Sequence, residues 1–163
     1  MSRFLLRFVS TGFFFGLAPI FPGTVGSLAG FLVWGMLRAC GWDMPYAVAV
    51  GSAVFLVAGV PMGTAYEKAV GRTDPREFVW DEFVGVLMTL APLSFMAGPD
   101  VPMIQLLLPA VAGCAAFRFF DIVKPFPIEQ SQRLRGGAGM MVDDALAAVP
   151  SAAVAVAVFV AMN

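Results

Sequence analysis

Long runs without a charged residue divide the chain into apolar segments. These runs cover residues 8–37, 44–66, 83–99, 101–117 and 145–163. A helix that crosses a bilayer needs roughly 20 apolar residues, so the helices of the shorter runs must include flanking residues. The pattern predicts about five transmembrane helices, at residues 27–40, 45–66, 81–93, 102–120 and 143–162. It predicts loops on one side at residues 41–44 and 94–100.

The N-terminal segment differs from these runs. Arg3 and Arg7 precede an apolar stretch, as they would in a signal peptide, but no small-residue cleavage site ends it. A turn rich in proline and glycine follows instead, at residues 19–23. Non-helical backbone at membrane depth needs protein or water around it. We therefore expect residues 1–18 to belong to the mature protein, as an interfacial or re-entrant helix.

The composition supports a membrane protein. Of the 163 residues, 60% are hydrophobic and 13% are charged, whereas a soluble domain is about a quarter charged. Too little polar surface exists to cover such a chain in water. We expect one domain over residues 1–163, an all-α, polytopic integral membrane helical bundle. The net charge of −1 and the lack of a basic run exclude nucleic acid as a partner.

The lysines and arginines predict the orientation of this bundle. If the turn at residues 21–27 is cytoplasmic, Arg38 is the one cation on the outer side. The cations on the inner side are Arg3, Arg7, Lys68, Arg72, Arg76, Arg118, Lys124, Arg133 and Arg135. This asymmetry follows the positive-inside rule. The same orientation places five carboxylates at helix ends on the cytoplasmic face: Asp81, Glu82, Asp121, Asp143 and Asp144.

These carboxylates are candidates for a metal site. An acid at the edge of a bilayer is costly unless it is paired, hydrated or bound to a metal. Asp81 alone could be a helix N-cap. Asp81 and Glu82 cannot both cap, because neighbours on a helix point about 100° apart. Five acids on one face therefore favour a site for a hard cation.

Arg118, Asp121 and Lys124 recur every third residue and share one helix face. Two interpretations stay open. The three side chains can form an internal salt bridge at the end of a span. Alternatively, Asp121 can bind a metal while Arg118 or Lys124 binds phosphate oxygens.

Glycines and hydroxyls supply further candidates. Backbone N–H groups of Gly136 and Gly137, just before a helix, can cradle an anion, although a flexible loop explains them too. Thr24 and Ser27 stand at a helix start, where capping is their structural role. Glycine pairs at 12/16, 26/30 and 59/63 indicate close helix packing.

The residue types that are missing narrow the chemistry. The chain has no histidine, which excludes a histidine-based triad, a phosphohistidine intermediate and histidine-bound zinc. Cys40 and Cys114 form no metal-ligand pattern. Carboxylates, hydroxyls and cations remain, and they suit Mg²⁺, which takes oxygen ligands. Water on such a metal can attack phosphorus.

Four motifs, at residues 16–27, 79–83, 117–128 and 136–144, resemble those of the phosphatidylglycerophosphatase A family. The resemblance implies a multi-pass protein of the bacterial inner membrane whose active site faces the cytoplasm. It implies Mg²⁺-dependent removal of the terminal phosphate of phosphatidylglycerophosphate, which yields phosphatidylglycerol. Some relatives have a histidine where this chain has Arg135. Residues 71–77 receive no role beyond a phosphate contact.

The predicted mechanism divides these residues into two groups. Asp81, Glu82, Asp121, Asp143 and Asp144 bind one or two Mg²⁺ ions and position a water, and one of these acids acts as base or nucleophile. The phosphate ligands are Arg118, Lys124, Thr24, Ser27, Gly136 and Gly137. The rival hypothesis is a small transporter whose edge carboxylates bind a coupling ion, although the chain shows no internal repeat. The sequence is silent on oligomeric state.

Overall fold

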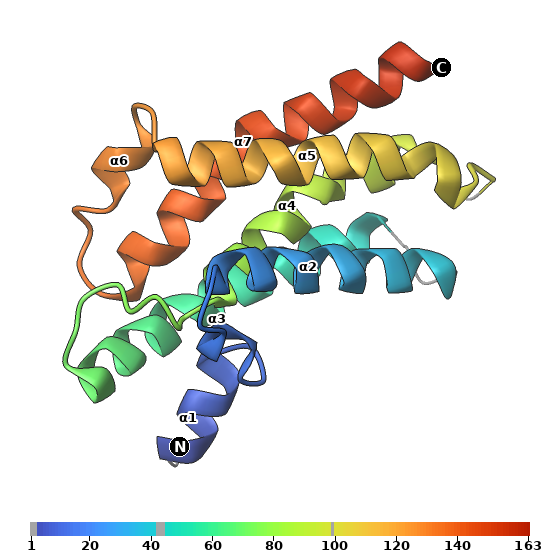
Figure 1. Ribbon diagram of the computed structural model, residues 1–163. Coiled ribbons are helices and arrows are strands. Elements are labelled where there is room, and N and C mark those ends of the chain that lie inside the picture. Colours follow the sequence, from blue (N-terminus) through green and yellow to red (C-terminus); the bar gives the residue numbers. More distant parts are fainter. Residues whose placement is uncertain (1–2, 42–44, 99) are drawn as a thin grey trace.

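The computed structural model describes residues 3–41, 45–98 and 100–163, and all of their regular structure is helical (Figure 1). Two short elements come first, α1 (Arg3–Ser10) and the 3₁₀ turn η1 (Phe15–Leu17). The long helices are α2 (Pro22–Ala39), α3 (Pro45–Val70), α4 (Trp80–Met96), α5 (Met103–Val123) and α7 (Gly137–Met162), and α6 (Ile128–Ser131) is a short turn. The all-α prediction is confirmed. The predicted loop at 41–44 lies outside the described residues from position 42 to 44.

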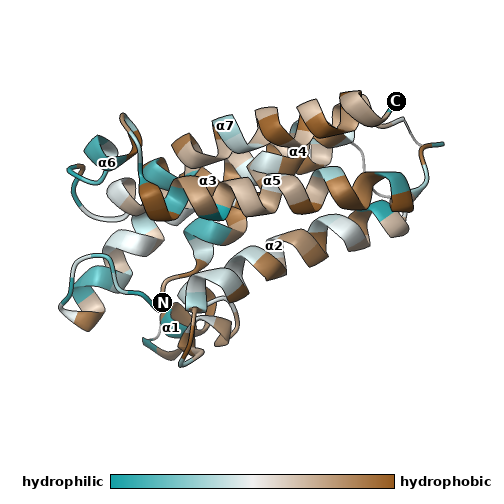
Figure 2. Ribbon diagram, turned by 45° about the horizontal axis from the view of Figure 1, so that its top comes forward, coloured by the Kyte–Doolittle hydropathy of each residue, from teal (hydrophilic) through white to brown (hydrophobic). Residues whose placement is uncertain are grey.

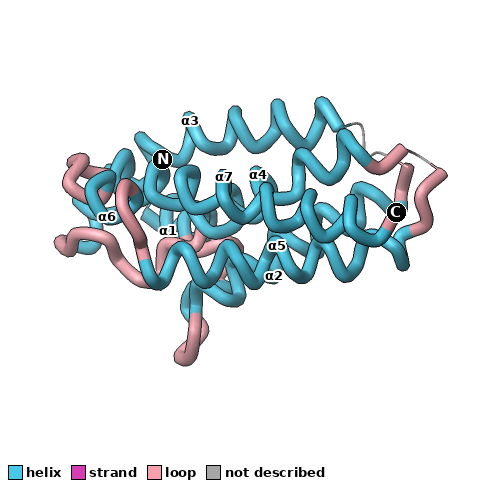
Figure 3. The backbone as a smooth tube through the Cα atoms, turned by 90° about the horizontal axis from the view of Figure 1, so that it is seen from above, coloured by secondary structure: helices cyan, strands magenta, loops and turns pink. Residues whose placement is uncertain are grey.

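Helix α4 is the centre of the bundle. It contacts α2, α3, α5 and α7, and Leu90 and Leu93 on it are fully buried. The indole nitrogen of Trp34 on α2 donates a hydrogen bond of 2.8 Å to the hydroxyl of Ser94 on α4. The five long helices run side by side, as Figure 3 shows from above. A central helix of this kind holds its first turn in a fixed position among the ends of its neighbours.

Within the described residues, three helices are long and apolar enough to cross a membrane: Tyr46–Val70, Met103–Val123 and Gly137–Met162. Their outer faces carry exposed apolar side chains such as Val57, Ile104 and Val149, and the apolar colouring extends along the bundle in Figure 2. Such large apolar faces are typical of lipid contact. Helix α4 has 17 residues. That α2 and α4 also span the membrane stays a prediction, as does the count of about five spans.

Small residues let the helices approach closely, as the glycine spacing predicted. A Cβ atom added to Gly63 on α3 would lie 2.9 Å from the Cα atom of Gly137 on α7. One added to Gly30 on α2 would lie 2.8 Å from the carbonyl oxygen of Phe83 on α4. Both positions lack room for a side chain. The packing role of Gly30 and Gly63 is therefore confirmed, and it fixes the spacing of α2, α3, α4 and α7. Helix packing was the wrong interpretation for Gly12 and Gly16, which lie in a turn and in η1.

Helix α1 lies across one end of the bundle rather than along it (Figure 1). The backbone N–H of Val79 donates to the carbonyl oxygen of Ser10, with an N–O distance of 3.3 Å, and so joins α1 to the segment before α4. Only Leu6 and Ser10 of α1 are buried. Its orientation suits the expected interfacial helix, but its placement in a membrane stays a prediction.

Candidate active site

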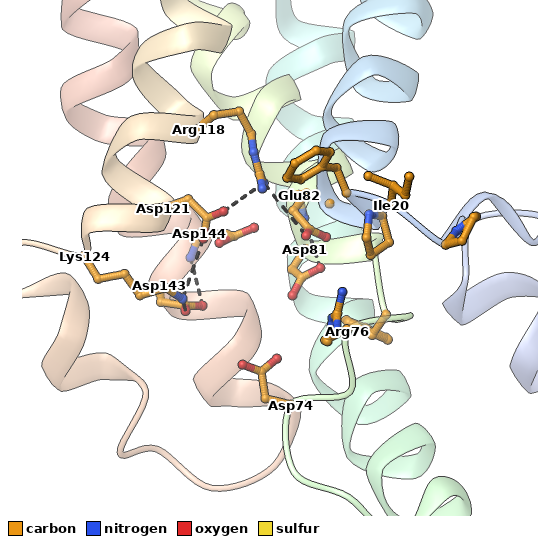
Figure 4. Close-up of a pocket in the computed structure, with 15 residues that line it drawn as sticks. Ile20, Asp74, Arg76, Asp81, Glu82, Arg118, Asp121, Lys124, Asp143 and Asp144 are labelled. Carbon is orange, nitrogen blue, oxygen red and sulfur yellow. Dashed lines mark hydrogen bonds and ion pairs between the residues drawn. The ribbon is translucent and has the colours of Figure 1, made fainter. Parts of the chain in front are cut away.

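Four helix ends meet around one cavity of about 420 Å³ (Figure 4). The first turn of α4 contributes Asp81 and Glu82, and the second turn of α7, which begins six residues before the predicted position 143, contributes Asp143 and Asp144. The end of α5 contributes three residues: Arg118, Asp121 and Lys124. The segment 19–23, which leads into α2, closes the remaining side. Residues from four separate parts of the sequence thus line one polar site.

Local sequence explains why these helices begin and end here. Pro22 occupies the first turn of α2, where its missing N–H costs no hydrogen bond. At the end of α5, Lys124 adopts a left-handed backbone with φ of 46°, and Pro125 follows it. A proline cannot continue a helix. The last turn of α5 therefore stops with Asp121 and Lys124 facing the cavity.

The carboxylates form two groups with the spacing of metal ligands. One oxygen each from Asp81, Glu82 and Asp144 lie within 4.8 Å of one another. One oxygen each from Asp121, Asp143 and Asp144 meet the same limit. Asp144 belongs to both groups, so it could bridge two ions.

The chemistry of these groups fits Mg²⁺. All the donors are carboxylate oxygens, which hard cations prefer. Asp81, Asp143 and Asp144 are buried. Oε2 of Glu82 and Oδ2 of Asp144 are also buried, and neither oxygen has a hydrogen-bond partner within the described part of the chain. A buried carboxylate oxygen without a donor is unfavourable unless a cation satisfies it.

Two cations lie between the acids. Nη1 of Arg118 is 2.8 Å from Oδ2 of Asp121 and 3.9 Å from Oε1 of Glu82. Nζ of Lys124 donates to Oδ2 of Asp143 and lies 3.6 Å from Oδ1 of Asp121. The salt bridge predicted for this face of α5 is therefore present. The same side chains line the cavity, and their binding of a metal or a phosphate stays a prediction.

The acids keep Lys124 charged. Partial burial lowers the pKa of Lys124. The hydrogen bond to Asp143 and the nearby charges of Asp121 and Asp144 raise this pKa by more than burial lowers it, so the net shift is upward. A protonated lysine carries three donors. Its ammonium group can therefore neutralise a carboxylate or an incoming phosphate oxygen throughout the physiological pH range.

Four of the predicted phosphate ligands lie elsewhere. Thr24 is exposed, and the hydroxyl of Ser27 donates to the carbonyl oxygen of Gly23 within α2, at 3.0 Å. The backbone N–H of Gly137 donates to Oγ1 of Thr64 at 2.9 Å, and Gly136 packs against the same threonine. None of the four lines the acidic cavity. Their role in phosphate binding stays a prediction that this geometry does not favour.

The expected capping interactions are also absent, and those interpretations were wrong. Phe21 is the N-cap of α2 and Val79 is the N-cap of α4, and neither helix start has a side-chain cap. Oδ1 of Asp81 instead accepts a hydrogen bond from the N–H of Glu82 at 3.0 Å. Asp81 is thus the second residue of α4 rather than its cap, and its side chain lines the cavity.

Sequence reasoning did not single out several residues of the site, although it allowed residues 71–77 a phosphate contact. Asp74 and Arg76 line the cavity from the loop 71–79, and Nε2 of Gln132 donates to Oδ2 of Asp143 at 3.1 Å. Loop residues have no periodicity that would reveal which way they point. Gly23 is the fourth residue of the site that the sequence did not single out, and a Cβ atom there would lie 2.2 Å from Oε1 of Glu82. Its position in a proline–glycine turn was the only signal.

The fold and the site define a class of protein: a membrane-associated helical protein with a cavity of carboxylates and cations at one end of its bundle. The chain belongs to the phosphatidylglycerophosphatase A family, whose model matches residues 8–159. No solved structure matches it.

Three curated relatives cover most of the chain. This chain is 35% identical over 147 residues to phosphatidylglycerophosphatase A of Escherichia coli K12, and the aligned region covers 90% of this chain and 78% of the relative. It is 34% identical over 152 residues to the Haemophilus influenzae protein of the same name, with 88% and 82% covered. It is also 35% identical over 153 residues to a Bacteroides thetaiotaomicron protein named "Putative phosphatidylinositol-3-phosphatase", with 91% and 89% covered.

Proposed function

We propose that this protein hydrolyses the terminal phosphate of phosphatidylglycerophosphate to give phosphatidylglycerol and inorganic phosphate. The family and two of the three relatives carry the name of that activity. One structural observation supports it most: five acids and two cations from three helix starts or ends line one cavity. Phosphoryl transfer needs such cations to neutralise phosphoryl oxygens and such acids to hold metal ions.

We propose Mg²⁺ as the metal, bound by Asp81, Glu82, Asp121, Asp143 and Asp144. Bound there, it would supply Lewis-acid activation of the phosphate and a more acidic water. Asp144 belongs to both oxygen groups, so it would be a ligand of either ion if two were bound. One carboxylate of the set that is not fully engaged accepts the proton of the water that attacks phosphorus while the glycerol oxygen leaves as the alcohol. Alternatively, that carboxylate attacks phosphorus and displaces the same alcohol, and water then hydrolyses the acyl phosphate to release phosphate and restore the acid.

Arg118 and Lys124 are the proposed phosphate ligands from the predicted set. Both already lie against carboxylates, at distances of 2.8 to 3.9 Å for the Arg118 pairs. A phosphomonoester brings two negative charges close to the same acids. We infer that Arg118 and Lys124 share their donors between acids and phosphate, and so offset the repulsion that the substrate meets in an acidic cavity.

The rim of the cavity suits a lipid. Ile20 and Phe21 line it and are 68% and 73% exposed. Phe21 also has a left-handed backbone, with φ of 52°, so the turn holds an aromatic ring outward. Exposed apolar side chains beside a phosphate site can contact acyl chains while the headgroup enters. We propose that the cavity opens at the cytoplasmic leaflet of the bacterial inner membrane.

The test is phosphate release by purified protein in detergent with Asp81→Asn, Asp121→Asn or Asp144→Asn. We expect each to lower the rate at saturating Mg²⁺ by at least about 100-fold, because charge stabilisation by a metal contributes several kcal/mol. EDTA should abolish the wild-type activity and Mg²⁺ should restore it. Asp100→Asn is the matched control, because Asp100 is exposed and outside the cavity. Near-normal rates for all three variants would overturn the site.

The substrate is tested in the same assay. The Bacteroides relative is named for a phosphatidylinositol-3-phosphatase, so phosphatidylinositol 3-phosphate is the informative competitor. We expect phosphatidylglycerophosphate to be the better substrate. A higher kcat/KM for the inositol lipid would overturn the substrate assignment while leaving the metal site intact. The comparisons do not favour the transporter hypothesis, and phosphate release from either lipid would exclude it.

A further inference from the structure

A second cavity, of about 310 Å³, lies between α1, the last turn of α3 and the loop 71–79. It shares no lining residue with the acidic cavity. Three guanidinium groups line it, those of Arg3, Arg7 and Arg72, together with one carboxylate, that of Glu77. The charges of these groups leave an excess of positive charge, whereas acids outnumber cations in the acidic cavity.

Two of these arginines are not neutralised. Nη2 of Arg72 lies 2.7 Å from Oε1 of Glu77, so these two charges compensate each other. Arg3 and Arg7 form no ion pair with any residue that the structure describes. They stand four residues apart and therefore on one face of α1. Two unpaired guanidinium groups that line the same cavity favour an anion that can accept several hydrogen bonds, and phosphate is such an anion.

The other face of α1 indicates how deep this cavity lies. Phe4 is 69% exposed, and its ring packs against Phe8 and Phe14 with centroid distances of 6.2 and 5.9 Å. An amphipathic helix with exposed aromatic rings and arginines lies in the membrane interface, with the rings toward the acyl chains and the cations at headgroup level. The cavity would then stand at the depth of the lipid phosphates.

The walls of the cavity match a lipid rather than a free ion. Leu6, Ala69 and Val70 contribute apolar surface beside the arginines. Tyr66, which is 4% exposed, completes the inner wall, and its ring is tilted by 36° against that of Phe78 at a centroid distance of 6.0 Å. A headgroup phosphate could reach the arginines while the glycerol backbone and first methylenes contact the apolar wall.

We propose that this cavity binds the phosphodiester headgroup of an anionic phospholipid, with Arg3 and Arg7 as its phosphate ligands. The site is separate from the proposed substrate cavity and does not depend on its chemistry. A lipid bound here would join α1 to the end of α3 and to the loop 71–79. The same loop sends Asp74 and Arg76 into the acidic cavity, so the bound lipid would also brace one wall of that cavity.

The test is lipid retention by the purified, detergent-solubilised protein, counted by native mass spectrometry without Mg²⁺. The probes are phosphatidylmethanol, whose headgroup is a bare phosphodiester, phosphatidylcholine with the same acyl chains, and inorganic phosphate. We expect phosphatidylmethanol to bind at least about tenfold more tightly than phosphatidylcholine. The variant R3Q/R7Q should lose that preference, since charge-assisted hydrogen bonds contribute about 1.4 kcal/mol or more, which is tenfold in affinity.

Two further variants separate this site from general charge and folding effects. R133Q/R135Q removes two exposed arginines outside either cavity, and should bind like the wild type. Ala69→Trp fills the cavity at an exposed position without changing a charge, and should lose binding while the helix signal in circular dichroism stays unchanged. Equal phosphatidylmethanol binding by wild type, R3Q/R7Q and Ala69→Trp would overturn the proposal. It would also be overturned if R133Q/R135Q lost as much phosphatidylmethanol binding as R3Q/R7Q. Binding of inorganic phosphate but not of the lipid would overturn the lipid assignment.

Discussion

At the scale of single residues, Gly23 shows how little space the acidic cavity leaves. A Cβ atom at this position would lie 2.2 Å from Oε1 of Glu82 and 3.0 Å from Nη2 of Arg118. One of these two groups, each proposed to bind metal or phosphate, must move if any side chain is added. The glycine at the start of α2 therefore positions the site although it has no functional group of its own.

We expect Gly23→Ala to lower phosphate release by about tenfold or more. The strain of overpacking is typically about 1–3 kcal/mol, and 1.36 kcal/mol in the transition state is a tenfold change in rate. Gly35→Ala is the matched control in the same helix, because its nearest neighbour would be Cε of Met103 at 3.4 Å. Both variants should be assayed with the lipid substrate. Equal activity in the two would show that Glu82 and Arg118 do not need their present positions.

At the scale of elements, the junction between α3 and α7 holds the two aspartates of α7 in place. A Cβ atom at Gly137 would lie 2.2 Å from the carbonyl oxygen of Val60 and 3.0 Å from Cα of Gly63. These neighbours are backbone atoms of α3, so they cannot move aside as a flexible side chain could. The distance between the two helices therefore depends on this glycine.

We expect Gly137→Ala to lower the midpoint of thermal unfolding by several degrees, because it forces α7 away from α3. Gly51→Ala in α3 is the control: nothing lies within 4 Å of its added Cβ, and alanine is the better helix former by about 1 kcal/mol. Unfolding is followed by circular dichroism in detergent. A Gly137→Ala protein of unchanged stability that binds phosphate more weakly would instead support the predicted role of Gly137 as a phosphate ligand.

At the scale of the whole molecule, charge is distributed unequally between the two ends of the bundle. Arg38 lies at the end away from the acidic cavity, where Nη2 donates to the carbonyl oxygens of Gly98 and Val101, each at 2.8 Å. The cavity end carries Arg118, Lys124, Arg133 and Arg135. Under the positive-inside rule this arrangement predicts a cytoplasmic cavity.

Cysteine labelling tests this orientation. Cys40 is exposed at the end of α2 away from the cavity, so a membrane-impermeant maleimide should label it in intact spheroplasts. Glu129→Cys, introduced together with Cys40→Ser, places an exposed thiol on α6 near the cavity, and it should react only after the membrane is opened. Cys114 is half-buried within α5 and serves as the internal background. The reversed labelling pattern would place the cavity outside.

Uncharged runs and the acids at their ends were enough to predict the helices and the acids of the site. Uncharged runs are a local property, so their lengths predicted all five long helices to within a few residues except at the start of α2 and of α7. The acids Asp81, Asp121 and Asp144 stood out because charge at a membrane edge is rare. The cost of burying charge applies to any packing of the helices, and the sequence alone therefore determined the class of protein and the carboxylate set.

Only the tertiary structure decided which of the other candidates reach the cavity. Thr24, Ser27, Gly136 and Gly137 looked like phosphate ligands by residue type, but Thr24 is exposed outside the cavity and the other three pack within or between helices. Asp74, Arg76 and Gln132 looked like loop residues, but they face the acids. Direction is set by how helices rotate and approach, which depends on contacts between residues far apart in the chain. The positive cavity beside α1 exists for the same reason, because it needs α1, α3 and the loop 71–79 in contact.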